Sequence, residues 1–217
     1  MEHAPAAERA LETSTGIDNR KLLMWLFLAS ECLFFGSLIA AYLVYRGDHE
    51  VPCRAGDLAA CVFPTDRTVN GVEYEGLFDI PFTSVSAFVL LMSSVSMVLS
   101  LAAIQRGDQR GFRVWLMTTA LLGIVFVGGQ AYEFTEFHEK GLSLGTNLFG
   151  TTFFVTTGFH GAHVTVGVLI LLSLLVMSFR GRLGQAQSLH VELAGLYWHF
   201  VDVVFVVIFS LIYLLQP

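Results

Sequence analysis

The stretch "LLMWLFLASECLFFGSLIAAYLVY", residues 22–45, is apolar throughout except for one carboxylate, Glu31, and a few small polar residues. A helix that crosses a hydrocarbon core about 30 Å thick needs roughly 20 apolar residues, and this stretch meets that length. Four further stretches of similar character follow at about 82–105, 112–134, 150–179 and 193–215. The sequence therefore predicts an all-α, polytopic membrane protein built as a bundle of five transmembrane helices.

The charged residues lie mainly between these stretches. Of the 217 residues, 54% are hydrophobic and only 14% are charged, which is the profile of a polytopic membrane protein. Residues 1–21 predict a polar cytoplasmic tail, and residues 22–217 predict a single transmembrane domain with an outer loop at 46–81. Much of the net charge of −6 comes from acidic residues in that loop. Nothing in the sequence is typical of a nucleic-acid binder.

Basic residues predict the orientation, because Lys and Arg accumulate on the inner side of membrane proteins. Eight of the 12 basic residues fall on the side of the N-terminal tail, and four fall on the opposite side. The larger group is Arg9, Arg20, Lys21, Arg106, Arg110, Arg113, Arg180 and Arg182, and the smaller is Arg46, Arg54, Arg67 and Lys140. The N-terminus is therefore expected inside and the C-terminus outside.

The three cysteines carry little pattern. Cys53 and Cys61 share the outer loop, where either a local disulfide or two unpaired thiols agrees with the sequence. Cys32 lies in the first span, where a small apolar role is expected. The sequence has no CxxCH and no CxxC, so it indicates neither covalent haem attachment nor a zinc or iron–sulfur centre.

Ionisable side chains also occur deep within the predicted spans. Glu31 lies about 13 Å into the first span if the helix rises about 1.5 Å per residue. An ionised carboxylate at a helix centre costs on the order of 3 kcal/mol, so such groups should face protein, water or one another. The others are His160 and His163 in the fourth span, and Glu192, His199 and Asp202 in the fifth.

The spacing of these residues indicates two polar stripes. His160 and His163 are three residues apart, as are His199 and Asp202, and this spacing places each pair on one helix face. Only a short inner loop separates the fourth and fifth spans, so we expect antiparallel neighbours. Their polar stripes are expected to face each other inside the bundle.

Four interpretations of this intramembrane cluster are open. The first is an interhelical hydrogen-bond network that fixes the packing of the first, fourth and fifth spans, and the second is a proton relay. A metal site is weaker, because di-iron bundles use Glu-x-x-His on two helices, whereas the spacings here are His-x-x-His and His-x-x-Asp. A haem site is weaker still, since two histidines three residues apart cannot bind opposite faces of one haem.

Residues near the span ends have structural interpretations. Glu133, near the outer end of the third span, is expected to be a water-exposed interfacial carboxylate. Trp25, Tyr45, Trp115 and Tyr213 fit an aromatic belt at the membrane interfaces. Small residues at helical spacing predict close-packed faces on the second and fourth spans, namely Ser86, Ser93, Ser96, Ser100, Gly158, Gly161 and Gly167.

Five motifs occur in order along the chain: "SECLFF" (30–35), "LLMSSVSMVLSLAAIQRGDQRG" (90–111), "QAYEF" (130–134), "GTTFFVTTGFHGAHVTVG" (150–167) and "LYWHFVDVVFVVIFSLIY" (196–213). Together they resemble subunit III of the haem–copper terminal oxidases, chiefly cytochrome c oxidase. The resemblance covers nearly all of the chain from about residue 20, and the last two motifs are highly specific.

The resemblance implies a non-catalytic core subunit of a complex that reduces O2 to water and pumps protons in aerobic respiration. Such a subunit lies beside subunit I, with subunit II and other respiratory subunits, in the bacterial plasma membrane. Haem and copper are then expected in partner subunits, with no cofactor and no metal in this chain. The implied roles are stabilising subunit I, supporting proton uptake and binding phospholipid.

The resemblance also assigns residues. Glu31 falls on the family's intramembrane glutamate, which reacts with carbodiimides. The characteristic polar positions of the last two spans fall on His160, His163, Glu192, Trp198, His199 and Asp202, and the basic residues near lipid headgroups fall on Arg20, Lys21 and Arg180. Many members have seven spans, and this chain lacks the first two. The family's lipid cleft is therefore expected to be absent, or completed by another subunit.

Two alternatives remain open. Within the family, the second candidate is the corresponding subunit of a quinol oxidase or an accessory protein of the nitric oxide reductases, because the electron donor docks elsewhere. From a different class, an independent proton-coupled transporter would use Glu31 and the histidines. Coupled flux in proteoliposomes that contain this chain alone would identify the transporter.

Overall fold

The computed structural model describes Gly16 and residues 18–45, 67–69, 72–74, 79–139 and 148–214. Within these residues, five helices are long and apolar enough to cross a membrane, which confirms the predicted fold class. They are α1 (Asn19–Tyr45), α2 (Ile80–Gln105), α3 (Gln109–Glu139), α4 (Leu148–Phe179) and α5 (Ser188–Ile208), with the short helices η4 (Gln185–Gln187) before α5 and η5 (Phe209–Leu214) after it. Cys53 and Cys61 lie outside the described residues.

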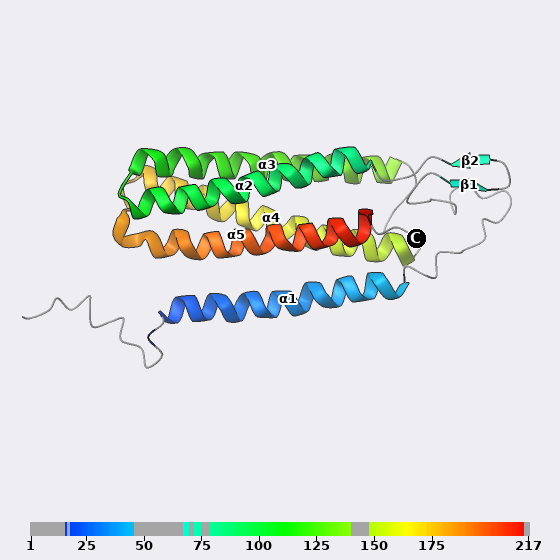
Figure 1. The fold of residues 1–217 in the computed structure, drawn as a ribbon, viewed down its shortest axis with the longest axis horizontal. Coiled ribbons are helices and arrows are strands. Elements are labelled where there is room, and N and C mark those ends of the chain that lie inside the picture. Colours follow the sequence, from blue (N-terminus) through cyan, green and yellow to red (C-terminus); the bar gives the residue numbers. More distant parts are fainter. Residues whose placement is uncertain are drawn as a thin grey trace, which may run out of the picture.

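The helices lie side by side and alternate in direction (Figure 1). α2, α3, α4 and α5 form a four-helix core, and α1 packs on the side of this core against α4 and α5. The start of α1, the α2–α3 turn and the α4–α5 connection lie at the same end of the bundle. We call this the inner end, following the predicted orientation, which stays a prediction.

Capping and turn residues fix where the second and third helices begin. The carboxylate of Asp79 accepts a hydrogen bond from the Phe82 N–H at 3.1 Å and so caps α2. Gly107 has φ +78°, a conformation that favours glycine, and it lets the chain reverse after α2. Asp108 then accepts from the Gly111 N–H at 3.0 Å, which starts α3.

The outer loop contains a short hairpin, where the sequence predicts only a loop. β1 (Arg67–Val69) pairs antiparallel with β2 (Val72–Tyr74), with Thr68 opposite Glu73. The intervening Asn-Gly dipeptide is a strong sequence signal for a two-residue hairpin turn. Three-residue strands are too short to show an alternating pattern, so this dipeptide was the only signal that could have revealed them.

Trp198 of α5 lies at the centre of the four-helix core and is 1% exposed. Its ring fills the space beside Gly123 of α3 and Gly167 of α4, where a Cβ atom would lie 2.6 Å and 2.9 Å from ring carbons. The indole Nε1–H donates to Ser93 Oγ of α2 at 3.0 Å. The predicted close packing of small residues is therefore present at Ser93 and Gly167. It is not present at Gly158, where a Cβ would meet no atom within 4 Å.

Candidate functional site

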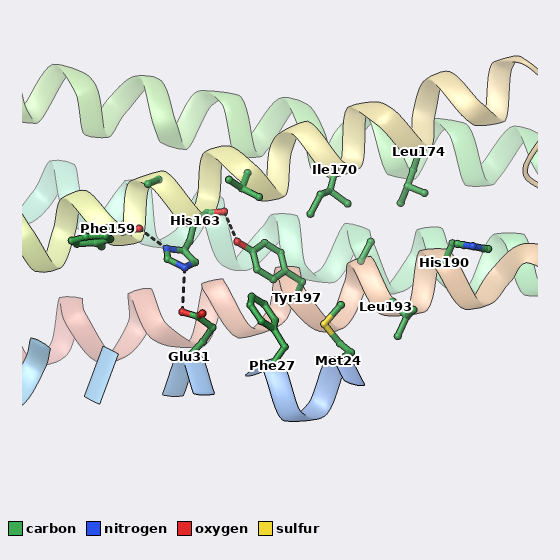
Figure 2. Close-up of a pocket in the computed structure, with 13 residues that line it drawn as sticks. Met24, Phe27, Glu31, Phe159, His163, Ile170, Leu174, His190, Leu193 and Tyr197 are labelled. Carbon is green, nitrogen blue, oxygen red and sulfur yellow. Dashed lines mark hydrogen bonds and ion pairs between the residues drawn. The ribbon is translucent and has the colours of Figure 1, made fainter. Parts of the chain in front are cut away.

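A groove of about 710 Å³ lies between α1, α4 and α5. It runs from the middle of the bundle toward the inner end (Figure 2). Most of its lining is apolar, and the polar groups gather at its two ends. Glu31, His163 and Tyr197 lie at mid-depth, and His190 lies at the inner end. The apolar lining includes Met24, Phe27, Ile170, Leu174 and Leu193.

Glu31 is paired with His163 across the groove. The carboxylate Oε2 lies 3.2 Å from His163 Nε2, and both side chains are mostly buried. His163 Nδ1 lies 2.7 Å from the carbonyl oxygen of Phe159, an acceptor, so Nδ1 carries the hydrogen. The contact between Glu31 and His163 joins α1 to α4 and identifies the partner of the intramembrane glutamate.

Tyr197 extends this contact to the fifth helix. Its hydroxyl donates to the carbonyl oxygen of His163 at 3.0 Å, and its ring stacks on Phe27 with centroids 6.3 Å apart. The groove end therefore links α1, α4 and α5 through one histidine. Tyr197 was not among the predicted polar residues, because nothing in its spacing distinguishes it from an ordinary core aromatic.

His160 does not take part in that contact, although it lies one turn away on the same helix. It is 1% exposed and lies among the rings of Phe35, Phe126 and Phe205, with centroid distances of 6.5, 6.0 and 5.2 Å. Neither ring nitrogen has a hydrogen-bond partner among the described residues. Aromatic packing, and not a polar network, holds this imidazole in place.

His199 and Asp202 of α5 face α2 and not the histidines of α4. His199 Nδ1 lies 2.7 Å from Ser94 Oγ, and Asp202 interacts with the same serine. The expectation that the polar stripes of the fourth and fifth spans face each other is therefore wrong. The physical reason is Trp198, which occupies the space against α3 and α4 and turns the next residue, His199, about 100° around the helix.

Glu192 lies near the start of α5 and forms a salt bridge with the start of α1. Its Oε1 is 2.6 Å from Lys21 Nζ, and about a third of each side chain is exposed. Lys21 was predicted to contact lipid headgroups, and in the structure Glu192 neutralises it. Arg20 and Arg180 are exposed at the same end of the bundle, and their lipid role stays a prediction.

Glu133 is buried, and this differs from the expected interfacial carboxylate. Its side chain is 7% exposed and accepts hydrogen bonds from Thr83 Oγ1 at 2.8 Å and from the Tyr213 hydroxyl at 3.2 Å. Tyr213 is likewise buried instead of belonging to the aromatic belt. This contact joins α2, α3 and η5 near the outer end. The other predicted belt residues, Trp25, Tyr45 and Trp115, are exposed.

The predicted intramembrane residues thus divide into separate contacts. Glu31 bonds to His163, Glu192 to Lys21, and His199 and Asp202 to Ser94, while His160 stands apart. The partners Ser94, Tyr197, Thr83 and Tyr213 were not predicted. Among the described residues, no three His, Cys, Asp or Glu side chains are grouped closely enough to hold a metal ion.

Comparison with known proteins agrees with the motifs. A model of the cytochrome c oxidase subunit III family matches residues 7–216. Cytochrome c oxidase subunit 3 of Thermostichus vulcanus is 40% identical over 91% of this chain and 88% of its own length. The subunit of the same name from Corynebacterium diphtheriae is 35% identical over 88% of this chain and 85% of its own length. Quinol oxidase subunit 3 of Bacillus subtilis is 32% identical over 99% of this chain and 98% of its own length. The chain therefore belongs to the cytochrome c oxidase subunit III family and is a multi-pass membrane subunit of a haem–copper oxidase complex.

Proposed function

We propose that the chain is a non-catalytic core subunit of a proton-pumping cytochrome c oxidase in a bacterial plasma membrane. It contacts subunit I directly, and the haem and copper lie in partner subunits. The observation that carries the proposal is that Glu31 and Glu192 bond to His163 and Lys21 of this same chain, while three aromatic rings enclose the imidazole of His160. Groups used in this way hold helices together and are not free to bind a redox centre.

The proposed role of these contacts is to keep α1 on the bundle. α1 buries only three side chains, Leu28, Phe35 and Tyr42, although it is long enough to cross the membrane. The contact of Glu31 with His163 and that of Lys21 with Glu192 add a polar attachment at mid-depth and another at the inner end. A firmly held subunit of this kind stabilises subunit I over many turnovers and so supports proton uptake there.

Removing this chain from the purified complex tests the proposal. We expect the haem and copper to stay with the remaining subunits and the separated chain to be colourless. The first turnovers of O2 reduction should persist, inactivation should come earlier, and adding back the unmodified chain should restore the lifetime. Haem or copper recovered at one equivalent per separated chain would contradict the proposal.

We propose cytochrome c as the electron donor of the complex, because relatives named cytochrome c oxidase subunit 3 reach 40% and 41% identity. Quinol is the second candidate, because the quinol oxidase subunit 3 of Bacillus subtilis aligns over 99% of this chain. Oxygen consumption by the purified complex with reduced cytochrome c, compared with a quinol, separates the two donors.

We also propose that the groove holds an acyl chain of a phospholipid. Apolar side chains line most of its length, and an acyl chain would cover them more favourably than water. Arg20 is exposed at the inner end, one helical turn before Met24 of the groove lining, and its guanidinium can bind the phosphate of a headgroup.

Ala162→Phe tests the lipid proposal. Ala162 lines the groove, so a phenyl ring there would fill the space of the acyl chain. We expect native mass spectrometry of the purified complex to show one phospholipid fewer per copy of the variant. Leu169→Phe is the matched control, because Leu169 lies on the same helix, is 60% exposed and is not part of the groove. Equal lipid retention by the two variants would contradict the proposal.

A further inference from the structure

The surface formed jointly by α2 and α5 carries polar groups at the middle of the membrane. Ser94 and His199 lie near the centres of the Ile80–Gln105 and Gln185–Leu214 spans, and both are partly exposed. α2 and α5 lie in front of α4 in Figure 1. Exposed apolar side chains lie on the same two helices, including Leu91, Val95, Val98, Val203 and Val206. We call this surface the α2–α5 face.

Hydrogen bonding on this face is incomplete. His199 bonds to Ser94 through Nδ1, and its other nitrogen, Nε2, has no partner among the described residues. Asp202, one turn along α5, is 5% exposed, and its Oδ1, which has no partner among the described residues, is enclosed within this chain, so His199 Nε2 is the unpaired atom that a neighbour can reach. Hydrocarbon supplies no hydrogen bonds, so polar atoms left unpaired at this depth cost several kcal/mol each if lipid covers them.

The exposed serine and threonine hydroxyls of α1 and α4 are, in contrast, already satisfied. Ser30 and Ser37 of α1, and Thr165 and Ser173 of α4, are exposed, and each donates to a carbonyl three or four residues earlier in its own helix. Such back-bonding satisfies a hydroxyl without any outside partner. These surfaces therefore suit lipid contact, and the α2–α5 face differs from them.

The apolar side chains of the face also suit contact with protein. Four of the five named above are valines, and the β-branch leaves each with few rotamers in a helix. Packing a neighbouring helix against them therefore costs little conformational entropy. A rigid apolar surface with an unsatisfied polar centre is what a second membrane-spanning protein would complete.

We infer that the α2–α5 face is where this chain docks against the transmembrane helices of a larger, haem-containing subunit of the complex. The inference rests on the proposed function, and it goes further by naming the surface and what the partner must offer. A helix of that subunit places a hydrogen-bonding side chain opposite His199 and apolar side chains against Val98 and Val203.

Site-specific photo-crosslinking in the intact complex in native membranes tests the inference. A photoreactive side chain is introduced at position 98 or 203 on the face, or at control position 33 on α1 or 125 on α3. Val203 and Val125 are closely matched, being 61% and 60% exposed. We expect crosslinks to the larger subunit from positions 98 and 203, and crosslinks to lipid alone from positions 33 and 125.

The opposite pattern, with protein crosslinks from position 33 or 125 and only lipid crosslinks from 98 and 203, would overturn the inference. Crosslinks from position 203 to a second copy of this chain would also overturn it. Failure of the proposed function has a different signature, because no haem-containing subunit would then co-purify with the unmodified chain.

A substitution series gives a second readout that does not depend on crosslinking. Val203→Trp is expected to lower recovery of the larger subunit with the tagged chain about tenfold, a loss of about 1.4 kcal/mol of association free energy. His199→Phe keeps an aromatic ring but removes the hydrogen-bonding nitrogens, so it should also lower recovery of the larger subunit with the tagged chain. Val125→Trp should leave recovery unchanged. Equal recovery with Val203→Trp and Val125→Trp would contradict the inference.

Discussion

Gly123→Ala is expected to destabilise the helix core by about 1–3 kcal/mol, the usual cost of overpacking a filled interior. The new Cβ would lie 2.6 Å from a ring carbon of Trp198 and 2.9 Å from Val168 Cγ2. Trp198 cannot easily move away, because Gly167 confines the other side of its ring and its Nε1–H is bonded to Ser93. The measurement is the thermal midpoint at which the chain leaves the purified complex.

Gly128→Ala is the matched control, because it lies on the same helix and its new Cβ would meet no atom within 4 Å. Alanine is favoured over glycine within a helix by roughly 1 kcal/mol, so this variant should be as stable as the unmodified chain or more stable. The two substitutions are chemically identical, but Gly123→Ala is expected to lower the stability, whereas Gly128→Ala is expected to leave it unchanged or raise it. If Gly123→Ala were as stable as Gly128→Ala, the packing around Trp198 would not be as described.

Glu31→Ala is expected to weaken the attachment of α1 by about 1–3 kcal/mol, because it leaves His163 Nε2 without its partner in a mostly buried site. The variant complex should still reduce O2 at nearly the normal initial rate, since Glu31 is proposed to act through structure and not through chemistry. The number of turnovers before inactivation should fall, and less of the chain should be recovered with the complex. Both quantities come from one preparation of the purified oxidase.

Ser37→Ala serves as the control for Glu31→Ala, because it also lies on α1 and its hydroxyl bonds only to the Phe34 carbonyl of its own helix. It should leave turnover number and recovery unchanged. A double substitution at Glu31 and His163 should cost less than the sum of the single ones, since the two side chains contact each other. Immediate and complete loss of O2 reduction in a fully assembled Glu31→Ala complex would contradict the structural role.

The fold could be predicted from sequence because one quantity, the length of apolar sequence, decides whether a helix crosses the membrane. The ends of the helices were less certain, because they depend on local capping. α3 was predicted at 112–134 but runs over Gln109–Glu139, since Asp108 caps its start and the helix continues through polar residues at the outer end. Hydrophobic length does not report such an extension.

The candidate site could be predicted only in part. Spacing indicates which residues share a helix face, but it does not indicate toward which neighbour that face turns. The rotation of α5 is set by the packing of Trp198 between Gly123 and Gly167, a contact among three residues far apart in the sequence. Because of this rotation, His199 contacts Ser94 of α2. His163 of α4 pairs with Glu31 of α1 and not with a polar side chain of α5.

The most direct test of the central claim, that this chain supports the chemistry of another subunit, is mild-detergent purification from native membranes through a tag on this chain. The preparation is then examined by its visible spectrum and by identification of the co-purifying proteins. We expect equimolar recovery with a larger subunit that carries the haem, and O2 reduction by the preparation. Recovery of this chain alone, or a haem spectrum that stays with this chain after the other subunits are removed, would contradict the claim.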